Sequence, residues 1–157
     1  MIMRQKGYTM IEIVLVVAII STLFAVVLVV LAPARRLAEA NDDSRRADLS
    51  SLLSAVQRYQ AFNRGNLPPG FDSVATSSQV IGTNASDCNA TCTATTKLPS
   101  CLDLSASLVE AYLAEIPVDP QTGSSGNTDY FANKYPDGKI VLGACDPEAA
   151  DAILLSR

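Results

Sequence analysis

The feature that most constrains this chain is an uninterrupted apolar run near its N-terminus. From Ile13 to Ala34 there are 22 consecutive residues without a charge, and only Ser21 and Thr22 among them are polar. A helix of that length spans about 33 Å, which matches the hydrocarbon core of a bilayer. Because small chains rarely bury a helix that is apolar all round, we expect the run to enter a membrane.

The rest of the chain is an ordinary, acidic protein. Residues 1–64 carry eight Lys and Arg against five Asp and Glu, a sum of +3, whereas residues 65–157 carry four against eleven, a sum of −7. The overall charge of −4 argues against a nucleic-acid partner, because phosphate binding needs a basic surface. The chain has no His, which excludes His-based catalysis and His metal sites, and no activated cysteine or carboxylate pair is recognisable. We therefore expect no enzyme activity.

A secretory signal peptide is the main alternative for the apolar run. Met1 to Lys6 is short and basic, and Ala32 to Ala34 offers a small-x-small cleavage site. Two observations weigh against this alternative. The run is longer than the usual apolar region of about 7–15 residues, and Glu12 lies in its first turns, where an acid serves no purpose in a disposable segment.

The residues that lead into the run have a specific order. A basic leader is followed by Gly7, Tyr8 and Glu12, and the sequence from the glycine reads Gly-Tyr-Thr-Met-Ile-Glu-Ile-Val-Leu-Val-Val. This order resembles the prepilin signal of type IV pilins and of the pseudopilins of type II secretion systems. The resemblance extends to about Pro68. Tyr8 departs from the phenylalanine that is most frequent in the family, and the run lacks the mid-segment proline of many members.

The resemblance implies how the N-terminus is processed and used. A prepilin peptidase would cut between Gly7 and Tyr8, and the new Tyr8 amine would be N-methylated. Glu12 would then pair with the Tyr8 amine of a neighbouring copy during polymerisation, which is reasonable because a buried carboxylate and a buried ammonium each need the other. The implied partners are further copies, related pilins, the prepilin peptidase, a membrane assembly platform and the lipid bilayer.

The resemblance also implies a location. Before assembly the chain would cross the inner (cytoplasmic) membrane once, with its body outside the cytoplasm, and after assembly it would form an extracellular or periplasmic filament. Arg4 and Lys6 in the leader agree with this orientation. The arginines beyond the run, Arg35 and Arg36 first, favour the opposite orientation by the positive-inside rule.

We expect an α+β, pilin-like fold, in which one long N-terminal helix packs against a small antiparallel sheet. Its second half is amphipathic, with an apolar stripe at three- and four-residue steps: Leu49, Leu52, Leu53, Val56, Tyr59 and Phe62. The expected organisation is a leader at 1–7, a transmembrane and polymerisation helix at 8–34, an amphipathic continuation at 35–64 and a globular head at 65–157. Gly65 and the Pro68 to Gly70 cluster should end the helix.

Charged residues between positions 35 and 48 allow two interpretations. They form a solvated helix face with pairs within the helix, such as Asp42 with Arg45 or Arg46, or they pair between subunits and fix register. The sequence favours the solvated face.

The head is predicted to be mostly loop, with short elements. Residues 71–102 read as a long loop with one short strand near Gln79 to Gly82, and Leu102 to Glu115 is typical of a short amphipathic helix. Asn127 to Tyr135 and Lys139 to Cys145 indicate two strands joined by a Pro-Asp-Gly turn.

Four cysteines lie in the head: Cys88, Cys92, Cys101 and Cys145. Their spacing, without any His, does not fit the usual paired ligands of a zinc site. An even number in a chain with an export signal favours two disulfides, for which three connectivities are possible.

The segment Ile116 to Pro120 is similar to the Pro-x-Asp-Pro element that precedes the last strands of major pseudopilins and many pilins. Because that region can hold calcium in pseudopilins, Asp119, Asp129 and Asp137 are candidate calcium ligands. They lack EF-hand spacing, so turn and surface roles are favoured and no cofactor is expected.

Two classes of function follow. The leading one is a structural subunit of a type IV pilus or pseudopilus, polymerised through its apolar helix. The alternative is a secreted or signal-anchored module that binds calcium or carbohydrate, in which the apolar run serves only for export. The position of the mature N-terminus separates them, at Tyr8 for the first class and at Arg35 for the second.

Overall fold

The computed structural model describes residues 7–30, 33–72, 74–88, 92 and 96–157, with no description of the Val29 side chain. The chain divides into two compact units, Met1–Arg36 and Leu37–Arg157, and each is described by itself. The predicted leader residues 1–6, Arg4 and Lys6 among them, lie outside the described residues.

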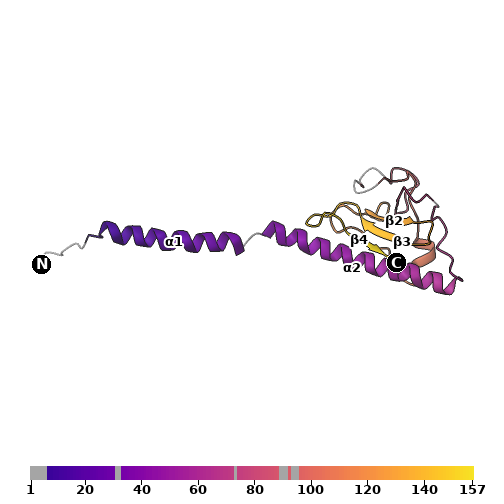
Figure 1. The fold of residues 1–157 in the computed structure, drawn as a ribbon, viewed down its shortest axis with the longest axis horizontal. Coiled ribbons are helices and arrows are strands. Elements are labelled where there is room, and N and C mark those ends of the chain that lie inside the picture. The colour runs from indigo at the N-terminus through magenta and orange to yellow at the C-terminus, as the bar shows by residue number, and fades with distance from the viewer. Residues whose placement is uncertain (1–6, 31–32, 73, 89–91, 93–95) are drawn as a thin grey trace. The chain divides into compact units, whose positions relative to one another are not determined.

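The predicted α+β fold is confirmed in its elements (Figure 1). Helix α1 spans Met10–Val30 and helix α2 spans Pro33–Phe62, and the two positions between them lie outside the described residues. The prediction of an unbroken helix through this point is therefore untested. Pro33 stands at the first position of α2, where its missing N–H leaves no intrahelical bond unmade.

Helix α2 owes its position to the apolar stripe that the sequence indicated. Leu49, Leu52 and Val56 are fully buried, and Tyr59 packs at the edge of the same core. Phe62 was predicted to continue the stripe, but it is 79% exposed because the helix runs past the end of the sheet. The helix ends at Phe62, just before the predicted stop signals. Arg64 has a positive φ of 57°, which turns the chain so that the N–H of Gly65 bonds back to the carbonyl of Gln60 at 2.8 Å.

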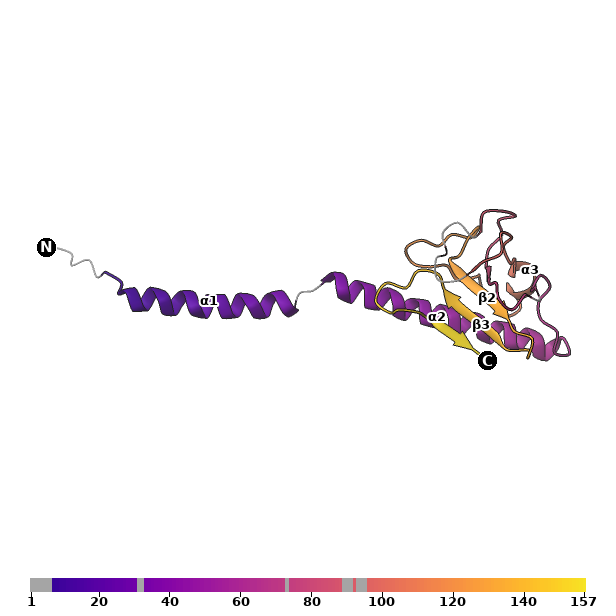
Figure 2. The ribbon, with the colours of Figure 1, turned by 45° about the horizontal axis from the view of Figure 1, so that its top comes forward.

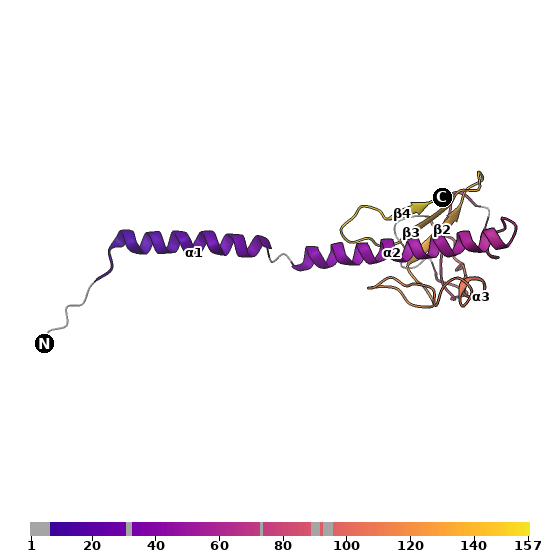
Figure 3. The same ribbon diagram turned by 90° about the horizontal axis from the view of Figure 1, so that it is seen from below.

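A four-stranded antiparallel sheet packs on α2, in the order β1-β2-β3-β4. Figure 2 shows β2 and β3 over the helix, and Figure 3 shows α2 with β2, β3 and β4 when the head is seen from below. The strands span Gln79–Val80 (β1), Tyr130–Lys134 (β2), Ile140–Ala144 (β3) and Leu154–Ser156 (β4). The predicted hairpin and the predicted short strand are thus present with narrower bounds, whereas β4 was not predicted.

The two faces of the sheet build two separate cores. Tyr130, Ala132 and Leu142 point inward and form the main core with α2. On β2, Phe131 points to the opposite, outer face and packs with Val80 and the cysteines in a second, smaller cluster. This alternation follows from the two-residue period of a strand, so both faces of β2 are buried over its first residues.

The helix predicted from Leu102 to Glu115 is wrong in length. Only Ser105–Leu108 (α3) is helical, because Val109 is extended and Glu110 adopts a positive φ of 70°. The N–H of Glu110 then bonds to the carbonyl of Leu113 at 2.8 Å and closes a tight turn. The spacing of the apolar residues indicated that they face the core. A tight turn can place such residues against a core as well as a helix can.

The structure selects one of the three possible disulfide connectivities. Cys88 pairs with Cys101, and Cys92 pairs with Cys145. The second bond joins the long loop to the residue that follows β3. The first bond ties two parts of the loop together, and the second holds the loop on the outer face of the sheet, where the apolar cluster is small.

Candidate functional site

The predicted processing and assembly residues lie in an exposed segment that leads into α1. Gly7 and Tyr8 precede the helix without regular secondary structure, and Tyr8 is 78% exposed. A Cβ placed on Gly7 would meet no atom within 4 Å. Gly7 and Tyr8 are thus not crowded by the described residues.

Thr9 lies directly before the first residue of α1 and forms hydrogen bonds with the first turn of the helix, which contains Glu12. The Thr9 carbonyl accepts hydrogen bonds from the N–H groups of Glu12 at 3.1 Å and Ile13 at 3.3 Å. The Thr9 hydroxyl oxygen lies 3.4 Å from the Glu12 amide nitrogen. Thr-x-x-Glu is the pattern of a capping box, so Glu12 has a local structural role available in addition to pairing with another chain. The sequence analysis missed this role, although the pattern was there to be read.

Helix α1 has no buried residue among those whose side chains are described. Its large apolar side chains, among those described, are about half exposed or more, from Val16 at 46% to Met10 at 89%. By length and composition it belongs to the one helical stretch, within the described residues, that could cross a membrane. Thr22 satisfies its hydroxyl within the helix, by donating to the carbonyl of Ile19 at 2.8 Å. An apolar surface of this extent needs a bilayer or other protein around it.

Residues 2–28 match the family model described as the prokaryotic N-terminal methylation motif. The chain carries the leader signature of type IV pilins and pseudopilins. A search of the curated proteins and a search of the solved structures return no match. The matched range ends within α1, so the head of this pilin-like protein is interpreted from its own contacts.

The signature and the fold agree on the kind of molecule. A pilin-type methylation motif points to a structural subunit rather than to an enzyme. The exposed apolar helix suits a pilin-like subunit that is first anchored in a membrane and then part of an extracellular filament.

In the head, the most distinctive site is a buried ionic cluster around Arg45. The Arg45 side chain is 1% exposed and makes two parallel bonds to Asp119, from Nε to Oδ2 at 2.6 Å and from Nη2 to Oδ1 at 3.0 Å. Its Nη1 also contacts Asp42 at 2.8 Å and Glu148 at 2.8 Å. One guanidinium thus joins α2 to two loops that are distant in sequence.

The carboxylates of this ionic cluster are saturated with donors. Asp42 accepts the backbone N–H groups of Glu148, Ala149 and Ala150 at 2.8 to 3.0 Å. Burial alone would raise the pKa of Asp42, but these bonds and Arg45 outweigh it and lower the pKa to about 2. The pKa of Asp119 is lowered in the same way, since Arg45 and two backbone N–H groups offset its burial.

The ionic cluster revises the interpretation of the charged helix segment. The predicted pair between Asp42 and Arg45 is present, but it is buried and not on a solvated face. Arg46 lies at an exposed site, as predicted, but it pairs with Asp43 and not with the predicted Asp42. A signal in the sequence could have revealed the difference, because Arg45 lies four residues before Leu49 and therefore continues the apolar stripe toward the core.

The three calcium candidates do not converge on one point. The Asp119 side chain is bound to Arg45, and its backbone N–H donates to the Thr128 carbonyl, which places Asp119 near Asp129, the residue before β2. Asp137 lies beyond the other end of β2, where its side chain accepts from the Lys139 N–H in the hairpin turn. The described residues contain no group of three His, Cys, Asp or Glu that could hold a metal ion.

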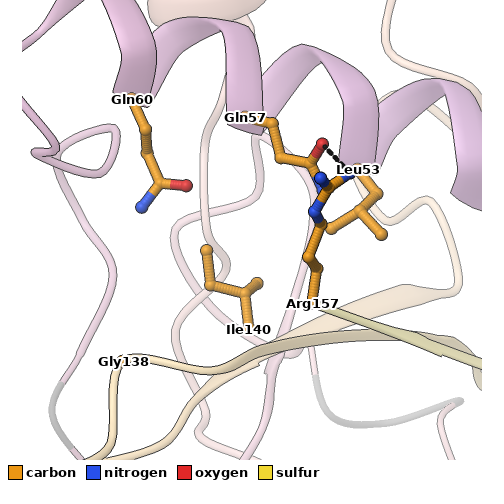
Figure 4. A pocket seen from close by; sticks show the side chains of 6 residues that line it. All are labelled: Leu53, Gln57, Gln60, Gly138, Ile140 and Arg157. Atoms are coloured by element: carbon orange, nitrogen blue, oxygen red, sulfur yellow. Dashed lines mark hydrogen bonds between the residues drawn. The ribbon is translucent and has the colours of Figure 1, made fainter.

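A hollow of about 370 Å³ lies between α2 and the hairpin turn (Figure 4). Gln57 and Arg157 meet across it in a 3.2 Å hydrogen bond, and Gln60, Leu53 and Ile140 complete the wall. The lining has amide, guanidinium and aliphatic groups. Its side chains offer no thiol or carboxylate for nucleophilic or acid–base chemistry.

Proposed function

We propose that this chain is a structural subunit of a type IV pilus or pseudopilus. It is inserted in the inner membrane as a prepilin, cut by a prepilin peptidase between Gly7 and Tyr8, and methylated at the Tyr8 amine. A membrane assembly platform then extracts it into a filament of its own copies and related pilins. Nucleic acid is not a direct partner in this proposal.

The exposed surface of α1 is the observation that carries the proposal. A helix with no buried side chain among those described, and within a methylation signature, has to be covered by lipid or by helices of other copies. Packing between copies would supply most of the association energy. From Ile13 onward, the described α1 side chains are apolar except for Ser21 and Thr22.

Glu12 would fix the stagger between neighbouring copies. It is the one charged residue of α1, and the charged amine created at Tyr8 lies only four residues away in sequence. In an apolar bundle, each charge is stabilised only where it meets the opposite charge of a neighbour. A wrong stagger leaves a carboxylate and an ammonium unpaired.

The alternative class of function is a secreted or signal-anchored module that binds calcium or carbohydrate. An apolar helix near the N-terminus also satisfies the requirements of an export signal. In that case cleavage after Ala34 would remove α1 and the first residues of α2, so the mature chain would begin at Arg35.

Variants at position 12 test the pairing and separate it from helix capping. We expect Glu12→Gln to insert normally in the membrane but to form few or no filaments, because Gln keeps the capping-box pattern and loses the charge. Glu12→Ala should fail in the same way. Filaments are counted by electron microscopy of sheared material, and membrane levels by immunoblot.

Glu115→Gln is the matched control, since it removes one exposed carboxylate from the head and leaves α1 unchanged. It should assemble like the wild type. Normal filaments from Glu12→Gln together with defective ones from Glu12→Ala would show that Glu12 acts through helix capping, and the pairing would be abandoned.

A further inference from the structure

The outer face of the sheet is only partly covered. The disulfide loop covers one end of it, where Phe131 packs with Val80 and Cys145. Beside this cluster an open hollow of about 370 Å³ remains, at the lower end of the range of about 300–1,000 Å³ that is usual for ligand pockets. We refer to it as the outer hollow, and its floor is formed by Phe131, Asn133, Val141 and Leu154.

The strand register gives the outer hollow a continuous apolar floor. Phe131 faces Gly143 across β2 and β3, and Gly143 faces Leu154 across β3 and β4. A Cβ on Gly143 would collide with the Phe131 ring and would lie 2.7 Å from Leu154 Cδ2. The absence of a side chain at Gly143 therefore lets the Phe131 ring and the Leu154 side chain lie over the sheet.

Polar groups line the other side of the outer hollow. The wall comes from the loop before β1 and includes Thr76 and Ser78, and the Asn133 Nδ2 ties it to the floor by donating to the Ala75 carbonyl at 3.0 Å. Asn133 is 7% exposed, and its Oδ1 accepts no hydrogen bond. That oxygen is shielded from solvent, so a ligand in the outer hollow would meet the exposed Thr76 side chain and not the Asn133 Oδ1.

The chemistry of the lining restricts the ligand. None of the residues that line the outer hollow is charged, which favours a neutral ligand. Tyr135, 39% exposed, adds an aromatic ring with a hydroxyl at the rim. An apolar and aromatic surface beside hydroxyl and amide groups suits a molecule with one apolar face and several O–H donors, and a pyranose ring has both.

We propose that the outer hollow binds a neutral carbohydrate. A pyranose ring lies with its C–H face on the exposed Leu154 and Tyr135 side chains, and a hydroxyl bonds to Thr76. The proposal does not depend on filament assembly, because every residue that it uses belongs to the head.

The test is an NMR titration of the ¹⁵N-labelled full chain. The protein is held in a phosphocholine detergent, because the head groups of glycoside detergents would compete. The probes are the methyl glycosides of glucose, galactose, mannose and N-acetylglucosamine, added one at a time. At least one is expected to shift the amide signals of Thr76, Asn133 and Val141 in a saturable manner.

Two variants and one control complete the test. Tyr135→Ala should weaken the binding about tenfold, which corresponds to one lost contact. Thr76→Val is the second variant, and it leaves the core of the head unchanged because Thr76 is exposed. Phe62→Ala is the control, since it removes an exposed aromatic ring that is not part of the outer hollow, and it should bind like the wild type.

Three results would overturn the proposal. The first is that no glycoside shifts these signals, and the second is that the shifts persist unchanged in Tyr135→Ala and Thr76→Val. The third is that a Gly/Ser peptide shifts the same amides while the glycosides do not, which would make the outer hollow a polypeptide site.

Discussion

At the scale of single residues, Arg45 decides how the loops of the head attach to α2. Its guanidinium contacts Asp42, Asp119 and Glu148, which belong to the helix, to the Pro-x-Asp-Pro segment and to the loop after β3. The Glu148 carboxylate is held further by Asn41 at 3.0 Å and Gln121 at 3.1 Å. The first turns of the head's helix are thus fixed by ionic contacts, whereas the later turns are fixed by apolar packing.

Arg45→Met tests this arrangement. Methionine keeps an apolar stem but leaves three carboxylates without their cation, so we expect a loss of about 3 kcal/mol in the free energy of unfolding. Urea denaturation followed by the near-ultraviolet circular dichroism of tyrosine measures the loss. Arg46→Met is the matched control, because its ion pair with Asp43 has the same spacing but is exposed, and it should change the free energy by less than about 0.5 kcal/mol. Equal losses in the two variants would refute the role of Arg45.

The lowered pKa values predict how acid affects the head. Asp42 has an ordinary pKa of 3.8 and a folded-state pKa of about 2, so its stabilising effect is present above pH 3.8 and is lost as the pH falls through about 2. The contribution is about 2 kcal/mol. We expect the free energy of unfolding to fall between about pH 4 and 2, and to fall less steeply in Asp42→Asn. The same acid dependence in wild type and Asp42→Asn would contradict this assignment.

At the scale of elements, local signals predicted some segments and failed for others. The Pro136 to Gly138 turn between two apolar runs indicated the hairpin, because turn residues and strand periodicity act over a few residues. The Leu102 to Glu115 segment misled, since helical spacing of apolar residues does not reveal the positive φ of Glu110. Strand β4 has only three residues and forms its hydrogen bonds with β3. Its own sequence is too short to carry a strand periodicity that would predict it.

The candidate sites divide in the same way. Gly7, Tyr8 and Glu12 form a contiguous motif, which a sequence shows directly. The ionic cluster joins Arg45 to Asp119 across 74 positions, and no local pattern pairs two residues so far apart. The cysteine connectivity is also a property of the folded head, and the sequence left it open among three possibilities.

The two disulfides are expected to contribute unequally to stability. The Cys92–Cys145 bond has a sequence separation of 53 and the Cys88–Cys101 bond one of 13. Because a longer loop loses more entropy on closure, replacing the first pair by alanine should cost about 4 kcal/mol and replacing the second about 3 kcal/mol. Urea denaturation of the two double variants measures both. A larger loss from the Cys88–Cys101 pair would contradict the loop-entropy argument.

At the scale of the whole molecule, the chain combines two units with opposite requirements. The unit Met1–Arg36 contains an apolar helix with no buried side chain among those described, whereas Leu37–Arg157 has its own core, two disulfides and a buried ionic cluster. The head satisfies most of its apolar and ionic groups internally. The N-terminal unit satisfies its apolar surface only in lipid or against other copies, which is the property required of a subunit that is stored in a membrane and then polymerised.

The position and chemistry of the mature N-terminus test this account most directly. Mass spectrometry of the chain isolated from its native cells identifies the first residue and any modification of its amine. The account predicts a chain that begins at Tyr8 with a methylated α-amino group. A mature chain that begins at Arg35 would contradict it, because the helix proposed to build the filament would then have been removed.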